Sequence, residues 1–265
     1  MLFGMVESFK KQHQGKSLSI KSWRRPCMLQ AAYPVNFLRN LARELAETDV
    51  IFPIGVDFIP SDGLHDFLES LTKRGLFAGR GAFAVPTFEV VRDVAIPTNK
   101  DQLLSSIKDK KAKPILAEGE PVSVDGSWDL AHVQFVDYGR WYKTKNELYE
   151  RPLVFENEPY LVVNRSEPCF PNYDERFIYY GGDKVEQVLH LKQRGWRFFV
   201  LPGHFVVHVQ HAGVAWHGSE RWLSRKKVWL LLDMVRQELK EKVTCPCPNH
   251  LMSIDAMNDI VSRAG

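Results

Sequence analysis

The sequence contains no long apolar run, few cysteines and no concentration of one charge. Its longest apolar runs, such as residues 228–232, are far shorter than the roughly 20 residues that a helix needs to cross a bilayer. We therefore expect no membrane contact by this chain itself. Lysines and arginines are dispersed among acidic residues, and the net charge is only +3. This distribution argues against a nucleic-acid-binding surface.

The four cysteines do not form the usual zinc-knuckle pattern. Cys245 and Cys247 are closer together than paired zinc ligands normally are, and no second pair follows them. A disulfide of the C-terminal segment or free thiols are favoured over a metal site with the nearby His250. Residues 1–16 lack a sustained apolar core and a cleavage site of small residues, so no signal peptide is expected.

The composition is that of an ordinary globular protein. The 265 residues are 45% hydrophobic and 25% charged, which is enough for one domain with a full core. Strand-like and helix-like segments alternate, and this pattern predicts an α/β fold with one open sheet. The predicted helices are 34–45, 61–71, 103–107, 184–193 and 221–242, and the predicted strands are 50–54, 82–86, 153–155, 160–163, 198–201 and 205–208.

A candidate metal site begins at Asp57, which follows the apolar segment 50–54. Open α/β sheets bind ligands beyond the carboxyl ends of their strands, and a carboxylate there can hold a divalent metal beside a nucleotide diphosphate. His208 ends another apolar strand, with His204 and His211 close by in the sequence. An imidazole from this group could complete the metal shell. A turn-capping aspartate and a core histidine are the alternative interpretations.

Acidic residues near a pair of glycines are candidates for a general base. They are Glu156, Glu158, Asp174, Glu175 and Asp183. The glycines Gly181 and Gly182 would let the backbone approach a sugar closely. An inverting glycosyl transfer needs one carboxylate to take the proton of the acceptor hydroxyl. The same acids could instead begin a helix or form local ion pairs, and the sequence by itself does not rank them.

Several short motifs follow one another in unbroken order from about residue 33 to residue 239. They are 33–40 (YPVNFLRN), 86–89 (PTFE), 132–141, 158–163 (EPYLVV), 173–177 (YDERF), 181–184 (GGDK) and 200–211 (VLPGHFVVHVQH). Together they resemble the LARGE-type glycosyltransferases, family 49. A series of co-linear motifs at matching spacing is much more specific than any one of them.

The resemblance implies a GT-A fold, an open mixed sheet flanked by helices. It also implies metal-dependent, inverting transfer of glucuronic acid or N-acetylglucosamine from a UDP-sugar to a glycan or glycoprotein acceptor. Family members are usually Golgi proteins with manganese in the site, so a location in the Golgi lumen is expected. The implied metal ligands are Asp57, His208 and His211.

The resemblance also implies roles for the other candidate site residues. Asn36 and Arg39 are expected to face the nucleotide, beside Asp57. For the catalytic base, Asp174 and Asp183 are ranked together and Glu158 is placed behind them.

Two departures from the family pattern bear on activity. Where the family has a DxD motif, this chain has Gly55 and Asp57, so the first carboxylate is absent. The family also has further strands and a helix before the YPVN helix, and we expect these N-terminal strands to be truncated here. The expected organisation is an N-terminal remnant or extension at 1–32, a glycosyltransferase domain at 33–243 and a C-terminal tail at 244–265.

Three hypotheses follow from these observations. The first is a glycosyltransferase domain, and the second is a catalytically inactive member, a pseudoenzyme or fragment that binds a glycan or a partner. The lowest-ranked hypothesis is an unrelated metal-dependent hydrolase that uses Asp57 and the histidines.

Overall fold

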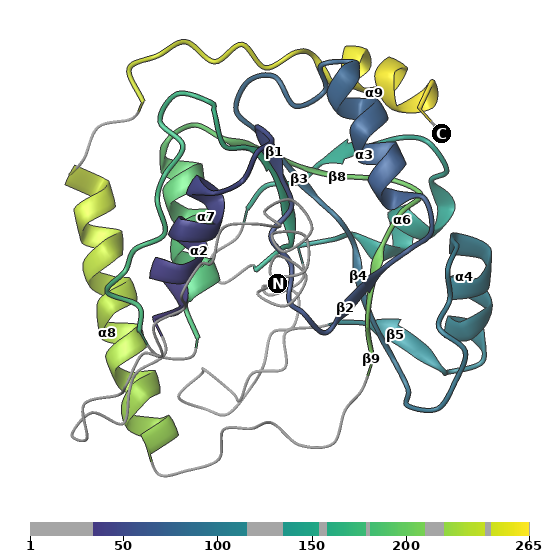
Figure 1. Cartoon of the computed structure of the whole chain (residues 1–265), viewed down its shortest axis with the longest axis horizontal. Helices are drawn as coiled ribbons and strands as arrows, with labels where there is room; N and C mark the ends of the chain where they lie inside the picture. The colour runs from purple at the N-terminus through teal and green to yellow at the C-terminus, as the bar shows by residue number, and fades with distance from the viewer. Residues whose placement is uncertain are drawn as a thin grey trace, which may run out of the picture.

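The computed structural model describes residues 34–115, 135–153, 158–178, 181–209, 220–241 and 245–264. Within this part, the strands form two open mixed sheets with helices around them (Figure 1). The strands are β1 (Val50–Ile51), β2 (Phe58–Pro60), β3 (Gly81–Ala84), β4 (Thr87–Val90), β5 (Ala112–Pro114), β6 (Tyr149–Glu150), β7 (Leu161–Asn164), β8 (Arg197–Val200) and β9 (Val206–Val209). The helices are α2 (Val35–Glu44), α3 (Leu64–Lys73), α4 (Lys100–Lys108), α6 (Tyr138–Lys143), α7 (Asp183–Gln193), α8 (Glu220–Glu241) and α9 (Ile254–Ser262).

The predicted α/β class with open mixed sheets and flanking helices is confirmed, but the strands are divided between two sheets where the sequence predicted one. One sheet has the order β1-β7-β3-β8-β6, and the other has the order β2-β9-β4-β5. In the first sheet β3 and β8 are parallel, and in the second β4 and β9 are parallel. Pro86 and Pro202 lie where the chain leaves the first sheet for the second. Proline has no N–H to continue a strand ladder, so it suits these two breaks.

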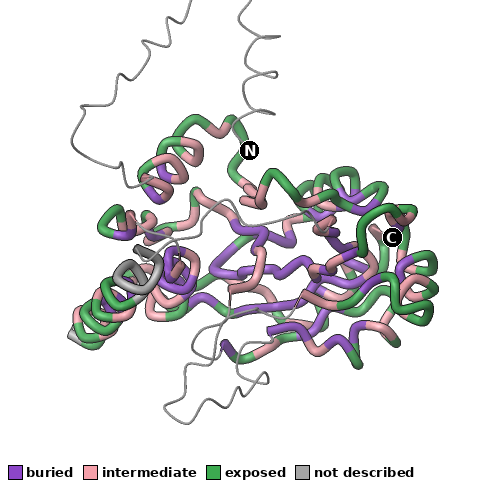
Figure 2. Tube along the Cα trace, turned by 90° about the horizontal axis from the view of Figure 1, so that it is seen from below, coloured by how far each residue is buried: buried purple, intermediate pink, exposed green. Residues whose placement is uncertain are grey.

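The first sheet is buried on both faces. Ala82 and Ala84 belong to a core cluster with Val188 and Leu191 of α7, while Phe83 belongs to the cluster on the other face. Successive side chains of a strand point to opposite faces, so this alternation separates the two cores. The second cluster includes residues of α3 and α9, which lie together in Figure 1. Figure 2 shows the buried residues concentrated along the central strands and the exposed ones on the outer helices.

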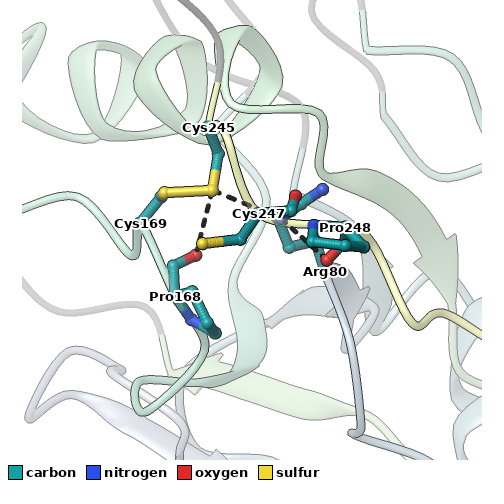
Figure 3. Close-up of a disulfide and its surroundings, with 6 residues drawn as sticks. All are labelled: Arg80, Pro168, Cys169, Cys245, Cys247 and Pro248. Carbon is teal, nitrogen blue, oxygen red and sulfur yellow. Dashed lines mark hydrogen bonds between the residues drawn. A yellow bond between two sulfur atoms is a disulfide. The ribbon is translucent and has the colours of Figure 1, made fainter.

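The segment that the sequence predicted as a C-terminal tail carries α9 and contributes to the core. Met257 and Val261 are buried, with exposures of 0% and 1%. A disulfide joins Cys169 to Cys245 across a sequence separation of 76, and it ties this segment to the loop after β7 (Figure 3). Ser253 caps α9 by accepting a hydrogen bond from the backbone N–H of Ala256.

Helix α2 is present where the sequence predicted a helix, but its buried side is polar. Asn36 and Asn40 are buried, whereas Leu41 and Leu45 are exposed. The apolar spacing that indicated the helix therefore does not mark its inner face. The two asparagines are held instead by hydrogen bonds to a distant segment, described below.

Three other expectations are wrong in detail. β1 is only two residues long, and Asp57 lies in the turn just before β2 rather than at the end of a longer strand. β5 lies at Ala112–Pro114, where the sequence predicted neither a helix nor a strand. The predicted strand 153–155 is not formed at Leu153, which lies in a loop after β6, and residues 154 and 155 lie outside the described residues. Among the described helices, none is both long and apolar enough to span a bilayer.

Helices α7 and α8 pack through a small cluster of their own, which includes Phe177 from the preceding loop. Gly182 precedes α7 with a φ of 71°, and a Cβ there would lie 2.6 Å from Cγ1 of Val228 on α8. Gly181 also has a positive φ, 99°, but a Cβ at that position would meet nothing within 4 Å. Glycine at 182 therefore satisfies both the backbone and the packing of α8.

We expect Gly182→Ala to destabilise the fold more than Gly181→Ala. Both substitutions carry the cost of a left-handed backbone, about 1–2 kcal/mol. Only Gly182→Ala adds overpacking against Val228, a further cost of about 1–3 kcal/mol. Urea unfolding of the two variants measures the difference, and equal losses of stability would contradict this account of the α7–α8 contact.

Candidate functional site

A row of side chains crosses the second sheet from one strand to the next. The strand register pairs Phe58 with His208, His208 with Glu89, and Glu89 with Lys113. Residues paired directly across strands present their side chains on the same face. The row therefore places an aromatic ring, an imidazole, a carboxylate and an ammonium group side by side.

Asp57 meets this row at His208. Its Oδ2 lies 3.1 Å from Nε2 of His208, and Nδ1 of the same ring lies 3.9 Å from Oε1 of Glu89. The Asp57 side chain is 44% exposed and that of His208 is 18% exposed. The two residues that the sequence proposed as metal ligands are thus adjacent and open to solvent. His211, the third predicted ligand, lies outside the described residues.

Gly55 provides the space that the Asp57 carboxylate occupies. A Cβ at position 55 would lie 2.5 Å from Oδ1 of Asp57 and 3.1 Å from the ring of Phe58. A side chain there would displace the carboxylate from its position beside His208. With glycine at position 55, the metal donors here are the Asp57 carboxylate and the His208 imidazole. These are oxygen and nitrogen ligands of the kinds that Mn²⁺ accepts. They fit a divalent metal as a partial ligand set.

We call Asp57 and His208 together the Asp57 centre. A second group of residues adjoins this centre through aromatic contacts. The ring of Tyr160 lies 4.7 Å from that of Phe58, centroid to centroid. Nζ of Lys184 lies 4.8 Å from the centroid of the Tyr160 ring and 3.2 Å from Oε2 of Glu158. Burial by itself would lower the pKa of Lys184, but Glu158, Tyr160 and Asp183 outweigh it and raise the pKa. Lys184 is therefore a fixed positive charge next to the Asp57 centre.

Helix α2 holds the segment that carries Asp174. Nδ2 of Asn36 donates to the backbone oxygen of Asp174 at 2.8 Å, and Nδ2 of Asn40 donates to that of Tyr173 at 2.9 Å. Arg39 donates to Oδ1 of Asn36 at 2.9 Å and forms an ion pair with Asp183. Asn36 and Arg39, which the sequence assigned to the nucleotide side, here orient two of the predicted acids.

The Asp174 carboxylate forms an ion pair and several hydrogen bonds with Arg176. Nε of Arg176 lies 3.0 Å from Oδ1 and 2.9 Å from Oδ2, and Arg176 also pairs with Glu238 of α8. Burial raises the pKa of Asp174, but the hydrogen bonds from Arg176 outweigh it and leave the pKa lowered. The carboxylate is held ionised in a fixed position.

Each of the three predicted acids therefore has a cationic partner. Asp174 pairs with Arg176, Asp183 with Arg39 and Glu158 with Lys184. Glu158 and Asp183 both interact electrostatically with the Lys184 ammonium, whereas Asp174 lies between α2 and α7.

Sequence reasoning missed Glu186, whose side chain is completely buried. Its Oε1 accepts the backbone N–H of Asp174 at 3.0 Å, whereas Oε2 has no hydrogen-bond partner. Burial, and then the charge of Asp174, raise the pKa of Glu186 to about 8. An acid in the first turn of a helix is ordinary in sequence, since it complements the helix dipole, so no sequence signal marked this residue.

His190 lies one turn beyond Glu186, with its Nε2 3.6 Å from Oε1 of Glu186. Burial, and next the positive charge of Arg194, lower the pKa of His190 to about 4. At neutral pH both side chains are uncharged. Ligand atoms of Asp174, Glu186 and His190 lie within 4.8 Å of one another, so their arrangement could also suit a metal. Arg176 and Arg194 put positive charge beside that group and disfavour a cation there.

Comparison with known proteins agrees with the motifs. A family model described as "Glycosyl-transferase for dystroglycan" matches residues 8–242. The glycosyltransferase-like protein gnt14 of Dictyostelium discoideum is 32% identical over 213 residues, which are 77% of this chain and 31% of that protein. The xylosyl- and glucuronyltransferase LARGE2s of Danio rerio is 33% identical over 183 residues, 68% of this chain and 22% of the relative.

The human xylosyl- and glucuronyltransferase LARGE1 is 29% identical over 215 residues, 80% of this chain and 26% of the relative. The chain thus spans about a third or less of the length of these curated relatives. The matched part includes the α2 segment, the Asp57 centre and the candidate acids.

We expect the stability of the protein to fall between pH 6.5 and 8 because of Glu186. The unfolded side chain loses its proton near pH 4.5, but the folded one keeps it until about pH 8. The folded state therefore binds more protons in this window, and its stability falls as the pH rises, by roughly 2 kcal/mol. His190, whose pKa is lowered, affects the pH dependence of stability only below about pH 6.5.

Glu186→Gln removes the titrating group and keeps an acceptor for the N–H of Asp174. Urea unfolding at pH 6.5 and pH 8 should show the decrease in the wild type and not in the variant. Glu69→Gln, at an exposed site on α3, serves as the matched control and should keep the decrease. A wild-type slope retained in Glu186→Gln would show that another group causes it.

Proposed function

The chain belongs to the family 49 glycosyltransferases, and on that basis we propose that it transfers a sugar from a UDP-sugar to a glycan or glycoprotein with inversion. The proposed sugar is glucuronic acid, which the names of the LARGE relatives also carry, or N-acetylglucosamine. The observation that supports this most is the Asp57–His208 pair, held at 3.1 Å on the exposed side of the second sheet. Of this pair, His208 lies near the carboxyl end of β9, and open α/β sheets bind ligands beyond the carboxyl ends of their strands.

The proposed cofactor is manganese or another divalent metal, with Asp57 and His208 as its ligands and His211 as the expected third. Such a metal, when bound, supplies positive charge for the leaving diphosphate. The chain contributes a further charge of its own, since the Lys184 ammonium stands beside Tyr160 next to the same centre. Lys184 would bind and orient the negatively charged donor through this charge.

We propose Asp183 as the general base. Both oxygens of Asp174 are engaged by Arg176, and its lowered pKa makes it a weaker proton acceptor. Asp183 engages Arg39 through Oδ2, and its charge acts on Lys184, whose ammonium lies over the Tyr160 ring. It begins α7 two residues after Gly181, where a Cβ would meet nothing within 4 Å and the acceptor sugar would have room to approach. Asp174 would then position α2 and α7.

The proposed location is the Golgi lumen. The Cys169–Cys245 disulfide supports an oxidising compartment, because disulfides are rare in the reducing cytosol.

A second candidate is an inactive member that binds a glycan or a partner protein. Gly55 favours it, because the carboxylate that the family has at this position is absent and one anionic ligand is lost. The two functions differ in a simple respect. Only the enzyme needs metal-dependent affinity for UDP.

We expect calorimetric titration of UDP to show binding that requires Mn²⁺. Asp57→Asn or His208→Ala should weaken that binding roughly tenfold or more, because each removes a ligand of the metal. Asp62→Asn, an exposed acid after β2, is the matched control and should bind like the wild type. Folded protein that shows no heat with UDP and Mn²⁺ would favour the binding-module function.

The choice of base is tested by steady-state kinetics once a donor has been identified. We expect Asp183→Asn to lower kcat by about 10²–10⁴-fold with little change in the KM of the donor. Glu158→Gln should raise KM more than it lowers kcat, because Glu158 acts on Lys184. A larger kcat loss in Asp174→Asn than in Asp183→Asn would reverse the assignment.

The anomeric configuration of the product, measured by NMR, tests inversion.

A further inference from the structure

Three sulfur atoms lie together where the C-terminal segment passes the start of β3. Cys169 and Cys245 form the disulfide, and Cys247 is a free thiol. The three Sγ atoms all lie within 4.8 Å of one another. Figure 3 shows the Cys247 side chain turned toward the disulfide, beside Pro168. A thiol this close to a disulfide is in a position to attack it once the thiol has lost its proton.

Arg80 supplies a positive charge to this cluster. Its Nη1 donates to Sγ of Cys245 at 3.4 Å and to the backbone oxygen of Cys247 at 3.0 Å. Arg80 is only 6% exposed, so its charge is poorly screened by water. A cation next to a sulfur stabilises the thiolate, and a more stable thiolate leaves a disulfide faster. Of the two bonded sulfurs, that of Cys245 is therefore the better leaving group.

The surrounding backbone is anchored independently of the disulfide. The N–H of Arg80 donates to Oδ1 of Asn249 at 2.9 Å, and the N–H of Gly79 donates to Oε1 of Glu167 at 2.6 Å. These bonds hold both the C-terminal segment and the loop that carries Cys169 against the start of β3. The three sulfurs would remain near one another after the disulfide opens.

We propose that Cys169, Cys245 and Cys247 form a thiol–disulfide exchange site. The Cys247 thiol loses its proton, and the thiolate attacks Sγ of Cys169. A bond forms between Cys169 and Cys247 as the bond between Cys169 and Cys245 breaks. Cys245 leaves as a thiolate beside Arg80 and can take up the released proton. The number of disulfides is unchanged, so no oxidant or reductant is needed.

The exchange gives the C-terminal segment two alternative attachments to the same loop, two residues apart. Either cysteine of the pair can then secure α9 to the body of the protein. This inference does not depend on the proposed transferase activity, because the cluster contains none of the candidate site residues.

Peptide mapping of disulfides tests the proposal in full-length protein that carries Cys27→Ser, which removes the remaining cysteine. Thiols are blocked at acid pH, where exchange is quenched, before digestion. We expect Cys245→Ser to contain a Cys169–Cys247 bond and Cys247→Ser to contain only Cys169–Cys245. With Cys245 and Cys247 both present, incubation at pH 8 should yield both isomers.

Two results would overturn the proposal. One is Cys245→Ser protein that is folded by circular dichroism yet has Cys169 and Cys247 both blocked as free thiols. The other is protein with all three cysteines that keeps the single Cys169–Cys245 bond after incubation at pH 8. The second measurement decides the question even if the Cys245→Ser variant does not fold.

Discussion

The register at which β9 lies between β2 and β4 determines the geometry of the Asp57 centre. It sets His208 between Phe58 and Glu89, with Asp57 at the end of β2 that meets the imidazole. A shift of one residue would turn His208 to the other face of the sheet. The register itself follows from the backbone pairing of β4 and β9, which the chain enters after Pro86 and Pro202. The candidate metal ligands are thus positioned by strand topology, together with the space that Gly55 leaves for the Asp57 carboxylate.

Charge compensation is the second constraint on the site. Each candidate acid is partly buried and has a basic partner, and two of those partners come from other elements: Arg39 from α2 and Lys184 from α7. Removing one partner of such a pair leaves a desolvated charge, which costs more than the pair contributes. The network therefore holds its members in one geometry before any substrate arrives. Preorganised charges of this kind are what transition-state stabilisation requires.

Local patterns in the sequence were enough to predict the position of most elements. Helix α7 begins within one residue of its prediction, because Gly182 and the apolar spacing after it are local signals. The inner face of α2 could not be predicted, since Asn36 and Asn40 are buried by bonds to residues more than 130 positions away. The partners of the candidate acids are non-local in the same way. Motifs supplied the candidate site residues, but only the fold shows which of them are neighbours.

We propose that Asp57 and His208 form the donor metal centre. Crystals grown with UDP and Mn²⁺, measured at the manganese absorption edge, test it directly. The account predicts an anomalous peak within coordination distance of Nε2 of His208 and of the Asp57 carboxylate. A peak among Asp174, Glu186 and His190, or none in crystals that contain UDP, would contradict it.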